Sequence, residues 1–571
     1  MFRPENPHRI GRRHAPAAGR LSEFFRRMSR HPLDHPYLWN RRKLLATLGF
    51  GAAAAVTGRV AWSTWYGDQL RLDGGAVATV PTWARLDAID DEPGVEVIDS
   101  PAGPVATPVL AGEPLGPGPD HHFDVVINNG RVVDPASGFD GLVNVGIDGD
   151  KITALLGVPL LGDETIDAGG LIVAPGFIDL LSYEPNEFGA WLKIADGVTT
   201  NLAMHGVGAS ADQFFERYDG SSPVHFGGAF HHHYWRGAQL GIGIESAPTV
   251  AALDRLEGAA RDGIERGFAG IAFSPEYSPG TTNEEMARLV AVAAEYDHVS
   301  FFHLRHSDPD PPGTSLEALA EVMSIAERHE AATHIQHLTS TGGTFVMDEA
   351  IALIEQARDF GIDITACIYP YDFWGTYLAS NRFARGWRER FRIDYDDLQI
   401  AGTTQRLTPA SFARARAENK LVAALGSIPE EEVQQAMTRP WVMIGSDAIP
   451  TVGLNNHPRG AGTFARTLGR YVRDLGVLDL RTGLAKMTIQ PALRVERMIP
   501  AMRRKGRLQR GADADIVVFD PLRIADQATV AEPGRPSAGV SWVLVDGRIA
   551  LRSGRPQREV LAGRPMTADV S

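Results

Sequence analysis

Three polar residues stand at the ends of apolar segments that have the length of buried β-strands. His303 and His337 end two consecutive segments of this kind, and Asp447 ends the last one. Neutral imidazole nitrogens and carboxylate oxygens are suitable ligands for Zn²⁺. A single histidine in such a position is more often a hydrogen-bonded packing residue. The three residues together favour a metal site or another polar catalytic site.

These residues belong to a region, 171–500, in which short apolar segments alternate with amphipathic helical segments. This alternation predicts an α/β fold with a parallel sheet, and the length fits one closed, TIM-like (β/α)8 barrel. The residues that follow the strands would then meet at one face, where such barrels carry their chemistry. The eight candidate strands end at or near Asp179, Met204, Phe230, Ser274, His303, His337, Tyr369 and Asp447.

One connection of the predicted barrel is too long for a simple loop. Residues 372–440 predict an insertion, and their aromatic and arginine-rich part, 373–392, predicts a mobile lid over the barrel mouth. Strand-like segments flank the barrel at 122–170 and 505–560, and they predict a smaller β-domain. The Pro- and Gly-rich residues 79–120 predict a linker before this domain.

The net charge of the 571 residues is −14, and it is unevenly distributed along the chain. Residues 1–60 have twelve Lys and Arg against three Asp and Glu, so the rest of the chain carries −23. A body this acidic argues against nucleic acid as a partner. The single cysteine, Cys367, excludes an internal disulfide.

The basic N-terminal residues, 1–78, have the features of an arm followed by an export signal. Arg41 and Arg42 precede an apolar, Ala- and Gly-rich run that ends near Thr57. This pattern predicts a disordered arm and a twin-arginine signal, and the alternative is an amphipathic surface helix. Cleavage near residues 76–78 and retention as a membrane anchor both remain open. Either outcome would place the protein in the periplasm or on a membrane that faces it.

Residues 169–183 have the pattern of a turn, an apolar strand, a Pro-Gly turn and a second apolar strand. This segment resembles the entry into the barrel of the amidohydrolase superfamily, in particular of the N-acyl-D-amino-acid deacylases. The similarity covers about residues 122–555. It implies that the two flanking segments pair into one small β-sandwich. It also implies that His303 and His337 bind metal, and that Asp447 is the catalytic aspartate and contacts the metal.

The chain departs from that family at its other metal ligands. Leu181 and Tyr183 replace the two histidines of the family's His-x-His pair, and Gly206 replaces its cysteine. These replacements remove most of a second metal site. We therefore expect one zinc ion rather than two.

A catalytic zinc ion usually has three protein ligands, so His303 and His337 need a third. The first candidate is His205, one position from the lost cysteine. The alternatives are the carboxylate of Glu276 and one histidine of the tract 231–233.

The motifs that would contact a substrate match the family more closely. A tyrosine hydroxyl and an arginine guanidinium together suit a substrate carboxylate. We expect Tyr277, Arg305, Tyr371 and Arg459 to line an open pocket, and the alternative for each motif is a packing contact or a salt bridge. Thr339 stands where the family often has a lysine. The residues in question are Tyr277, Arg305, Tyr371, His457 and Arg459.

Two functions are compatible with these features. The first is a zinc-dependent hydrolase of a non-peptide C–N bond in a small molecule, similar to an N-acyl-amino-acid deacylase. In this reaction Asp447 would take a proton from water and pass it to the leaving amine. The second is a barrel that has lost its metal and binds a ligand or a partner protein without chemistry.

Overall fold

The computed structural model describes residues 94–98, 105–110, 112–113, 116–184, 186–449 and 457–570. The predicted arm and twin-arginine signal, 1–78, lie outside these residues and stay predictions. Within the described ranges, no helix combines the length and the apolar character that crossing a bilayer requires.

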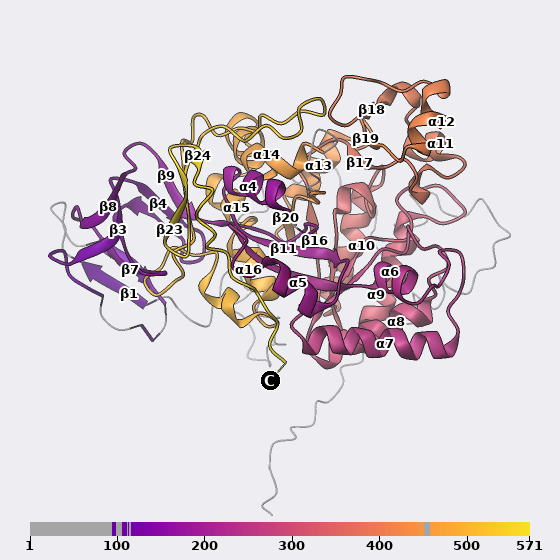
Figure 1. Ribbon diagram of the computed structural model, residues 1–571, viewed down its shortest axis with the longest axis horizontal. Helices are drawn as coiled ribbons and strands as arrows, with labels where there is room; N and C mark the ends of the chain where they lie inside the picture. The colour runs from indigo at the N-terminus through magenta and orange to yellow at the C-terminus, as the bar shows by residue number, and fades with distance from the viewer. Residues whose placement is uncertain are drawn as a thin grey trace, which may run out of the picture. The chain divides into compact units, whose positions relative to one another are not determined.

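A parallel sheet of eight strands forms the barrel, and each strand pairs with the next one in the order β10-β11-β12-β13-β14-β15-β16-β20. Figure 1 labels β11, β16 and β20 of this sheet. The last strand meets the first through two backbone hydrogen bonds, Asp447 N to Leu181 O at 2.7 Å and Tyr183 N to Ala448 O at 3.2 Å. The predicted barrel is confirmed, and all eight predicted strand ends lie within a few residues of the observed ones. The strands are β10 (Phe177–Asp179), β11 (Val198–Val207), β12 (His225–His231), β13 (Ile271–Phe273), β14 (Val299–Phe302), β15 (Ala332–Ile335), β16 (Ile364–Ile368) and β20 (Val442–Ile444).

The helices between the strands cover the outside of the barrel, and their ends follow from local sequence. Thr282 and Thr314 each begin a helix by accepting the amide N–H three residues on, from Glu285 and Glu317, whose side chains bond back to them. The apolar residues of these helices are buried against the strands. The longer helices are α4 (Glu187–Ala195), α5 (Ala211–Tyr218), α7 (Val250–Glu265), α8 (Asn283–Glu295), α9 (Ser315–His329), α10 (Met347–Asp359), α13 (Glu430–Met437) and α14 (Arg459–Arg466). Shorter ones are α15 (Leu480–Ala485) and α16 (Ile489–Val495).

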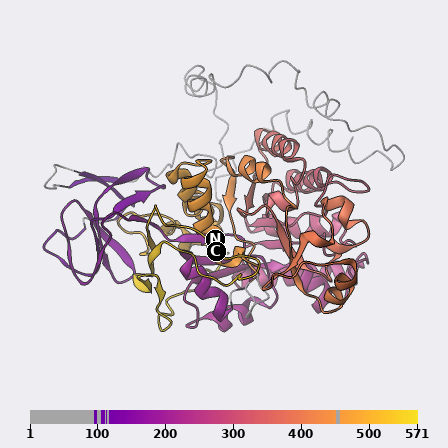
Figure 2. The ribbon, with the colours of Figure 1, turned by 90° about the horizontal axis from the view of Figure 1, so that it is seen from above.

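The small β-domain is built from both flanking segments, as the fold prediction required. Its first sheet has the order β7-β6-β3-β8, and its second has the order β24-β23-β22-β21-β9-β4-β5. The two segments meet where β21 pairs antiparallel with β9. Figures 1 and 2 show the yellow C-terminal strands lying against the indigo N-terminal ones. The strands are β3 (His122–Asn128), β4 (Arg131–Asp134), β5 (Phe139–Leu142), β6 (Asn144–Asp148), β7 (Lys151–Leu156), β8 (Leu161–Asp167), β9 (Ile172–Pro175), β21 (Ile516–Phe519), β22 (Val540–Val545), β23 (Arg548–Arg552) and β24 (Arg555–Pro556).

The predicted linker, 79–120, contains regular structure that the sequence analysis missed. Strands β1 (Gly94–Ile98) and β2 (Val105–Val109) pair antiparallel, and Leu110 N donates to Arg510 O at 3.0 Å. Only Gly94 and Pro108 of the Pro and Gly residues in 79–120 belong to these two strands. Part of the predicted linker therefore has regular structure, at residues 94–98 and 105–109.

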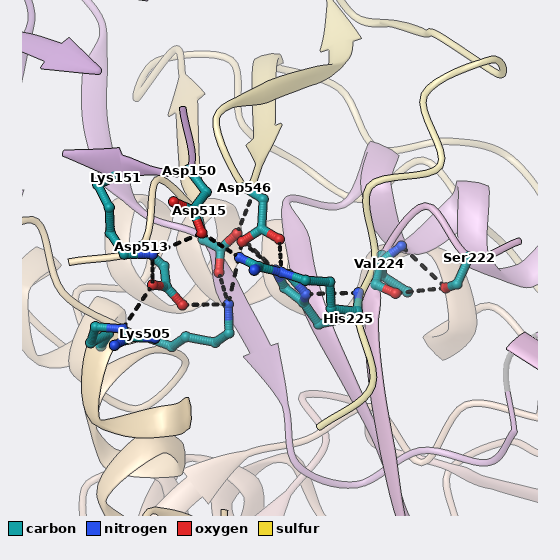
Figure 3. Close-up of polar contacts among 11 residues, drawn as sticks. Asp150, Lys151, Ser222, Val224, His225, Lys505, Asp513, Asp515 and Asp546 are labelled. Atoms are coloured by element: carbon teal, nitrogen blue, oxygen red, sulfur yellow. Dashed lines mark hydrogen bonds and ion pairs between the residues drawn. The ribbon is translucent and has the colours of Figure 1, made fainter. Parts of the chain in front are cut away.

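A buried network of charges joins the β-domain to the barrel (Figure 3). His225 Nε2 of β12 lies 3.0 Å from Asp515 Oδ1, and Lys505 Nζ lies 2.6 Å from Asp515 Oδ2 and 3.0 Å from Asp513 Oδ2. Burial raises the pKa of Asp515, but His225 and Lys505 lower it more, so the net pKa lies below the usual range. His225, Asp515 and Asp546 could by their spacing hold a cation. Because Lys505 already compensates these carboxylates, the arrangement is an ion-pair network rather than a metal site.

The insertion forms a separate small sheet at the C-terminal end of the barrel strands. Its strands have the order β17-β19-β18, and an aromatic cluster that includes Trp374, Phe383 and Trp387 packs them against two helices. Arg382 reaches from this insertion to the main-chain oxygen of Ser340, just after β15. The elements are β17 (Trp374–Tyr377), α11 (Trp387–Phe391), β18 (Leu398–Ile400), α12 (Pro409–Ala417) and β19 (Leu421–Ala424).

Candidate active site

Three histidines converge at the C-terminal face of the barrel. His205 lies within β11, His303 follows β14 and His337 follows β15, and one ring nitrogen of each lies within 4.8 Å of the others. His303 Nδ1 and His337 Nε2 are 3.1 Å apart. All three side chains are buried, and three imidazoles with an open fourth position are a common catalytic zinc site. The donor set therefore fits a zinc ion.

The protonation of these rings also fits metal binding. Burial lowers the pKa of His205 and of His337 well below the usual value, and the neighbouring histidines lower it further. Both rings are therefore neutral at pH 7, with one nitrogen lone pair available to a metal. His337 has a φ of 32° and Asp447 a φ of 48°, a left-handed conformation that is uncommon for residues other than glycine. Such strain is often concentrated at functional sites.

Glu276 fixes the orientation of one of the rings. Its Oε2 lies 2.7 Å from His303 Nε2 and 2.8 Å from Ser307 Oγ. Burial raises the pKa of Glu276, but Arg382 and His303 lower it more, to about 2, so the group is a carboxylate that can only accept. His303 Nε2–H must then donate to it, which leaves the Nδ1 lone pair directed at His337. Glu276 therefore lies behind a histidine rather than in the predicted alternative role of third ligand.

Asp447 lies beside the histidines and is held by Arg459. Arg459 Nη2 is 2.8 Å from Asp447 Oδ2, and Arg459 Nε donates to the main-chain oxygen of Asp447 at 2.7 Å. The other carboxylate oxygen, Oδ1, is 3.8 Å from His205 Nε2 and accepts no hydrogen bond from the described residues. Burial raises the pKa of Asp447, although Arg459 opposes this. A buried acceptor of this kind is suited to bind a proton donor such as water.

The three replaced ligand positions have a clear structural explanation. Leu181 is fully buried, and the Tyr183 ring stacks on the His205 ring with a centroid distance of 4.4 Å. Gly206 has a φ of 111°, and a Cβ at this position would lie 2.5 Å from His231 Cγ. A cysteine in place of Gly206 would therefore collide with His231.

The predicted substrate-binding residues divide into two groups. Tyr277 and Arg459 line the small cavity that contains the three histidines, and the Tyr277 ring is 4.7 Å from the His303 ring. Arg305 instead forms an ion pair with Glu321 on α9, with Nε 3.0 Å from Oε2.

Tyr371 and His457 do not line that cavity either. Their rings pack against each other at 6.1 Å, and the Arg466 guanidinium lies 4.7 Å from the centre of the Tyr371 ring. Of the residues predicted to line the pocket, Arg305 therefore pairs with Glu321 instead, and Tyr371 packs against His457 and Arg466. The sequence analysis missed Arg382, whose signal was the unusual density of arginine in 373–392.

The histidine tract 231–233 contributes no ring nitrogen to the cluster of His205, His303 and His337. His232 Nε2 bonds to Glu285 Oε1 at 2.9 Å, while His231 and His233 line a second, larger pocket. The inner cavity has a volume of about 20 Å³, enough for about one water molecule. The outer pocket has a volume of about 440 Å³ and shares Tyr183 and Ile449 with the inner cavity. The predicted open pocket is therefore a narrow inner cavity beside a wider outer one.

The known proteins that this chain is similar to belong to one class of hydrolases. The profile of the amidohydrolase family matches residues 388–551. The N-acyl-D-glutamate deacylase of Alcaligenes xylosoxydans xylosoxydans is 29% identical over 505 residues, which cover 79% of this chain and 97% of that protein. The D-aminoacylase of the same organism is 27% identical over 467 residues, which cover 74% of this chain and 94% of that protein.

A solved structure agrees with the sequence comparison. The N-acyl-D-glutamate deacylase of Bordetella bronchiseptica, in complex with zinc and a phosphonate inhibitor, has a TM-score of 0.68 and 26% identity. The match covers 78% of this chain and all of that one. The barrel, the β-domain built from both flanking segments and these matches make the chain similar to proteins of the amidohydrolase superfamily. Within that superfamily, the chain resembles D-aminoacylase and the related N-acyl-D-amino-acid deacylases.

Proposed function

We propose that the protein is a hydrolase that uses one zinc ion to cleave the amide bond of an N-acyl amino acid. The observation that carries this proposal is the convergence of His205, His303 and His337 beside Asp447 at the mouth of the barrel. A relative that matches this chain over 97% of its own length is named N-acyl-D-glutamate deacylase, and the structure of another such deacylase was solved with zinc.

Each residue then has a specific role. The three histidines would hold the zinc ion, which supplies Lewis-acid polarisation of the scissile carbonyl and makes water more acidic. Asp447 takes a proton from the attacking water as the water oxygen bonds to the carbonyl carbon. Asp447 then gives this proton to the amide nitrogen as the C–N bond breaks, which releases a carboxylic acid and an amine. Arg382 and Arg459 supply positive charge for a substrate carboxylate.

The second candidate function is a binding protein without catalysis. The observation that favours it is the Arg459–Asp447 ion pair, which occupies one oxygen of the proposed proton acceptor. The inner cavity of about 20 Å³ also leaves no room for a substrate unless side chains move.

Metal removal distinguishes the two functions. The purified protein should contain about one zinc ion per chain and should hydrolyse N-acyl amino acids to free amino acids. Dialysis against a chelator should abolish hydrolysis, and zinc should restore it, because the metal polarises the reacting carbonyl. Zinc content is measured by atomic emission and amine release by a fluorogenic reagent. A protein that binds no zinc and hydrolyses none of the compounds is a binding protein.

Substitution of Glu276 by glutamine should weaken zinc binding by about 10- to 100-fold, because partners that orient a metal-binding histidine contribute that much. The substitution removes the negative charge that holds the proton on His303 Nε2. Zinc affinity is measured by competition with a coloured chelator. Glu321→Gln is the matched control, since Glu321 pairs with Arg305 away from the three histidines. Equal zinc affinity in Glu276→Gln and wild type would show that Glu276 has no positioning role.

A further inference from the structure

The two halves of the barrel mouth differ in charge. The inner cavity is bounded on one side by Arg382, which contacts Ser340 after β15, and by Arg459, which contacts Asp447 after β20. The outer pocket is bounded mainly by residues in or after β10 to β13, among them Tyr183, His231 and Ser278, and also by Ile449 after β20. In the strand order, His205 belongs to β11 on the side of the outer pocket, and His337 follows β15 on the side of Arg382. His303 follows β14 between them, so the cluster of three ring nitrogens connects the two sides.

The outer pocket is apolar and has no basic anchor. Its wall includes Ile242, Ile244, Tyr234 and Ile449, and Ile244 has 48% of its surface exposed, an unusual value for a large apolar side chain. Among the described residues that line it, there is no lysine and no arginine.

The polar side chains of the outer pocket are neutral or already paired. Burial lowers the pKa of His231 to about 3 and that of His233 to about 4, with help from neighbouring histidines, so both are uncharged at neutral pH. Glu184 accepts from Gly208 N at 2.7 Å and pairs with Arg217 at 3.1 Å. An anionic group would therefore find no counter-charge in this pocket, whereas an apolar group would find complementary walls.

We propose that the outer pocket binds the acyl group of the substrate, and that this group is a medium-length aliphatic or aromatic chain rather than acetyl. The proposal rests on the proposed hydrolase function. In an N-acyl amino acid the carboxylate and the acyl chain lie on opposite sides of the amide bond. When the amide lies at the three histidines and the carboxylate reaches Arg382 or Arg459, the acyl chain extends toward Tyr183 and the outer pocket.

The volume of the pocket supports a large acyl group. It measures about 440 Å³, within the range of roughly 300–1,000 Å³ that is typical of pockets for drug-sized molecules. The single methyl group of an acetyl substrate would leave most of this apolar surface in water, with no gain from burial. An eight-carbon or phenylacetyl chain would cover Ile242, Ile244 and the face of Tyr183.

Acyl-chain selectivity tests the proposal. N-octanoyl-DL-leucine should have a kcat/KM at least about tenfold above that of N-acetyl-DL-leucine, because each fully buried methylene contributes about a fourfold gain in affinity. Gly237 lines the pocket, and a Cβ at this position meets no atom within 4 Å. Gly237→Phe should therefore fill the pocket and reduce the octanoyl-to-acetyl ratio. Gly258→Phe, on the exposed side of α7 with equally open surroundings, should leave the ratio unchanged.

Binding and hydrolysis together separate this proposal from the proposed function. Affinity for both leucine derivatives is also measured by calorimetry at a temperature where turnover is slow or absent. Hydrolysis with equal or better use of the acetyl compound overturns the acyl pocket and leaves the hydrolase intact. Tighter binding of the octanoyl compound without hydrolysis of either compound supports the pocket and overturns the hydrolase. An octanoyl preference that Gly237→Phe does not reduce overturns the assignment of this pocket.

Discussion

Replacement of His337 by alanine should abolish both zinc binding and amide hydrolysis. The His337 Nε2 atom lies 3.1 Å from His303 Nδ1, so its loss would leave only His205 and His303 to hold the ion. Two imidazoles bind zinc far more weakly than three, and the carbonyl would no longer be polarised. Zinc content should fall from about one ion per chain to a small fraction, and amine release should fall below detection.

His122→Ala is the matched control for this experiment. His122 is exposed on β3 of the small β-domain, where it bonds to Asp163, and its removal should change neither zinc content nor hydrolysis. Circular dichroism of His337→Ala must match the wild type, so that loss of zinc is not loss of fold. A folded His337→Ala protein that retains full zinc content would remove His337 from the metal site.

Replacement of Asp447 by asparagine should abolish hydrolysis while zinc remains bound. Asparagine keeps the shape of the side chain and can still accept from Arg459, but it cannot take a proton from water. Loss of a general acid–base group costs about 10²- to 10⁴-fold in rate, so kcat should fall by that amount. The rate is measured as amine release, with zinc content determined on the same sample.

Asp526→Asn provides the control, because Asp526 pairs with Arg466 at 3.1 Å and belongs to neither cavity. It should hydrolyse at nearly the wild-type rate. If Asp447→Asn loses zinc together with activity, Asp447 is a necessary metal ligand rather than mainly a proton acceptor. If Asp447→Asn remains active, another group accepts the proton.

The barrel could be predicted because its strands are mostly short apolar runs that alternate with amphipathic helical segments. That pattern placed His303, His337 and Asp447 at one face without any knowledge of distances. Whether His205 would join them depended on the orientation of its side chain. The hydrophobic periodicity and the composition of the sequence do not determine that orientation. The structure brings the His205 ring nitrogen into the group and directs Glu276 to the back of His303.

The errors came from side chains that have a strong competing partner. Arg305 comes two residues after His303, a spacing that suggested a pocket residue. Its guanidinium instead forms an ion pair with Glu321 on α9. Arg382 enters the cavity from an insertion whose tertiary position no local pattern specifies. Such choices are decided by long-range charge pairing and burial, so motif matching alone could not resolve them.

The pairing of β21 with β9 has a consequence for synthesis of the chain on the ribosome. Strand β9 ends at Pro175 and its partner begins at Ile516, a separation of 341 residues. At about 5–20 residues per second, the ribosome needs tens of seconds to supply that partner. During this interval the edge of β9 is exposed, and an exposed edge is a site for association with other chains. A nascent chain that is stalled or cut before residue 516 therefore has all the barrel strands but an unpaired edge on β9. Such a chain should need a chaperone to stay soluble, because the unpaired edge can associate with other chains.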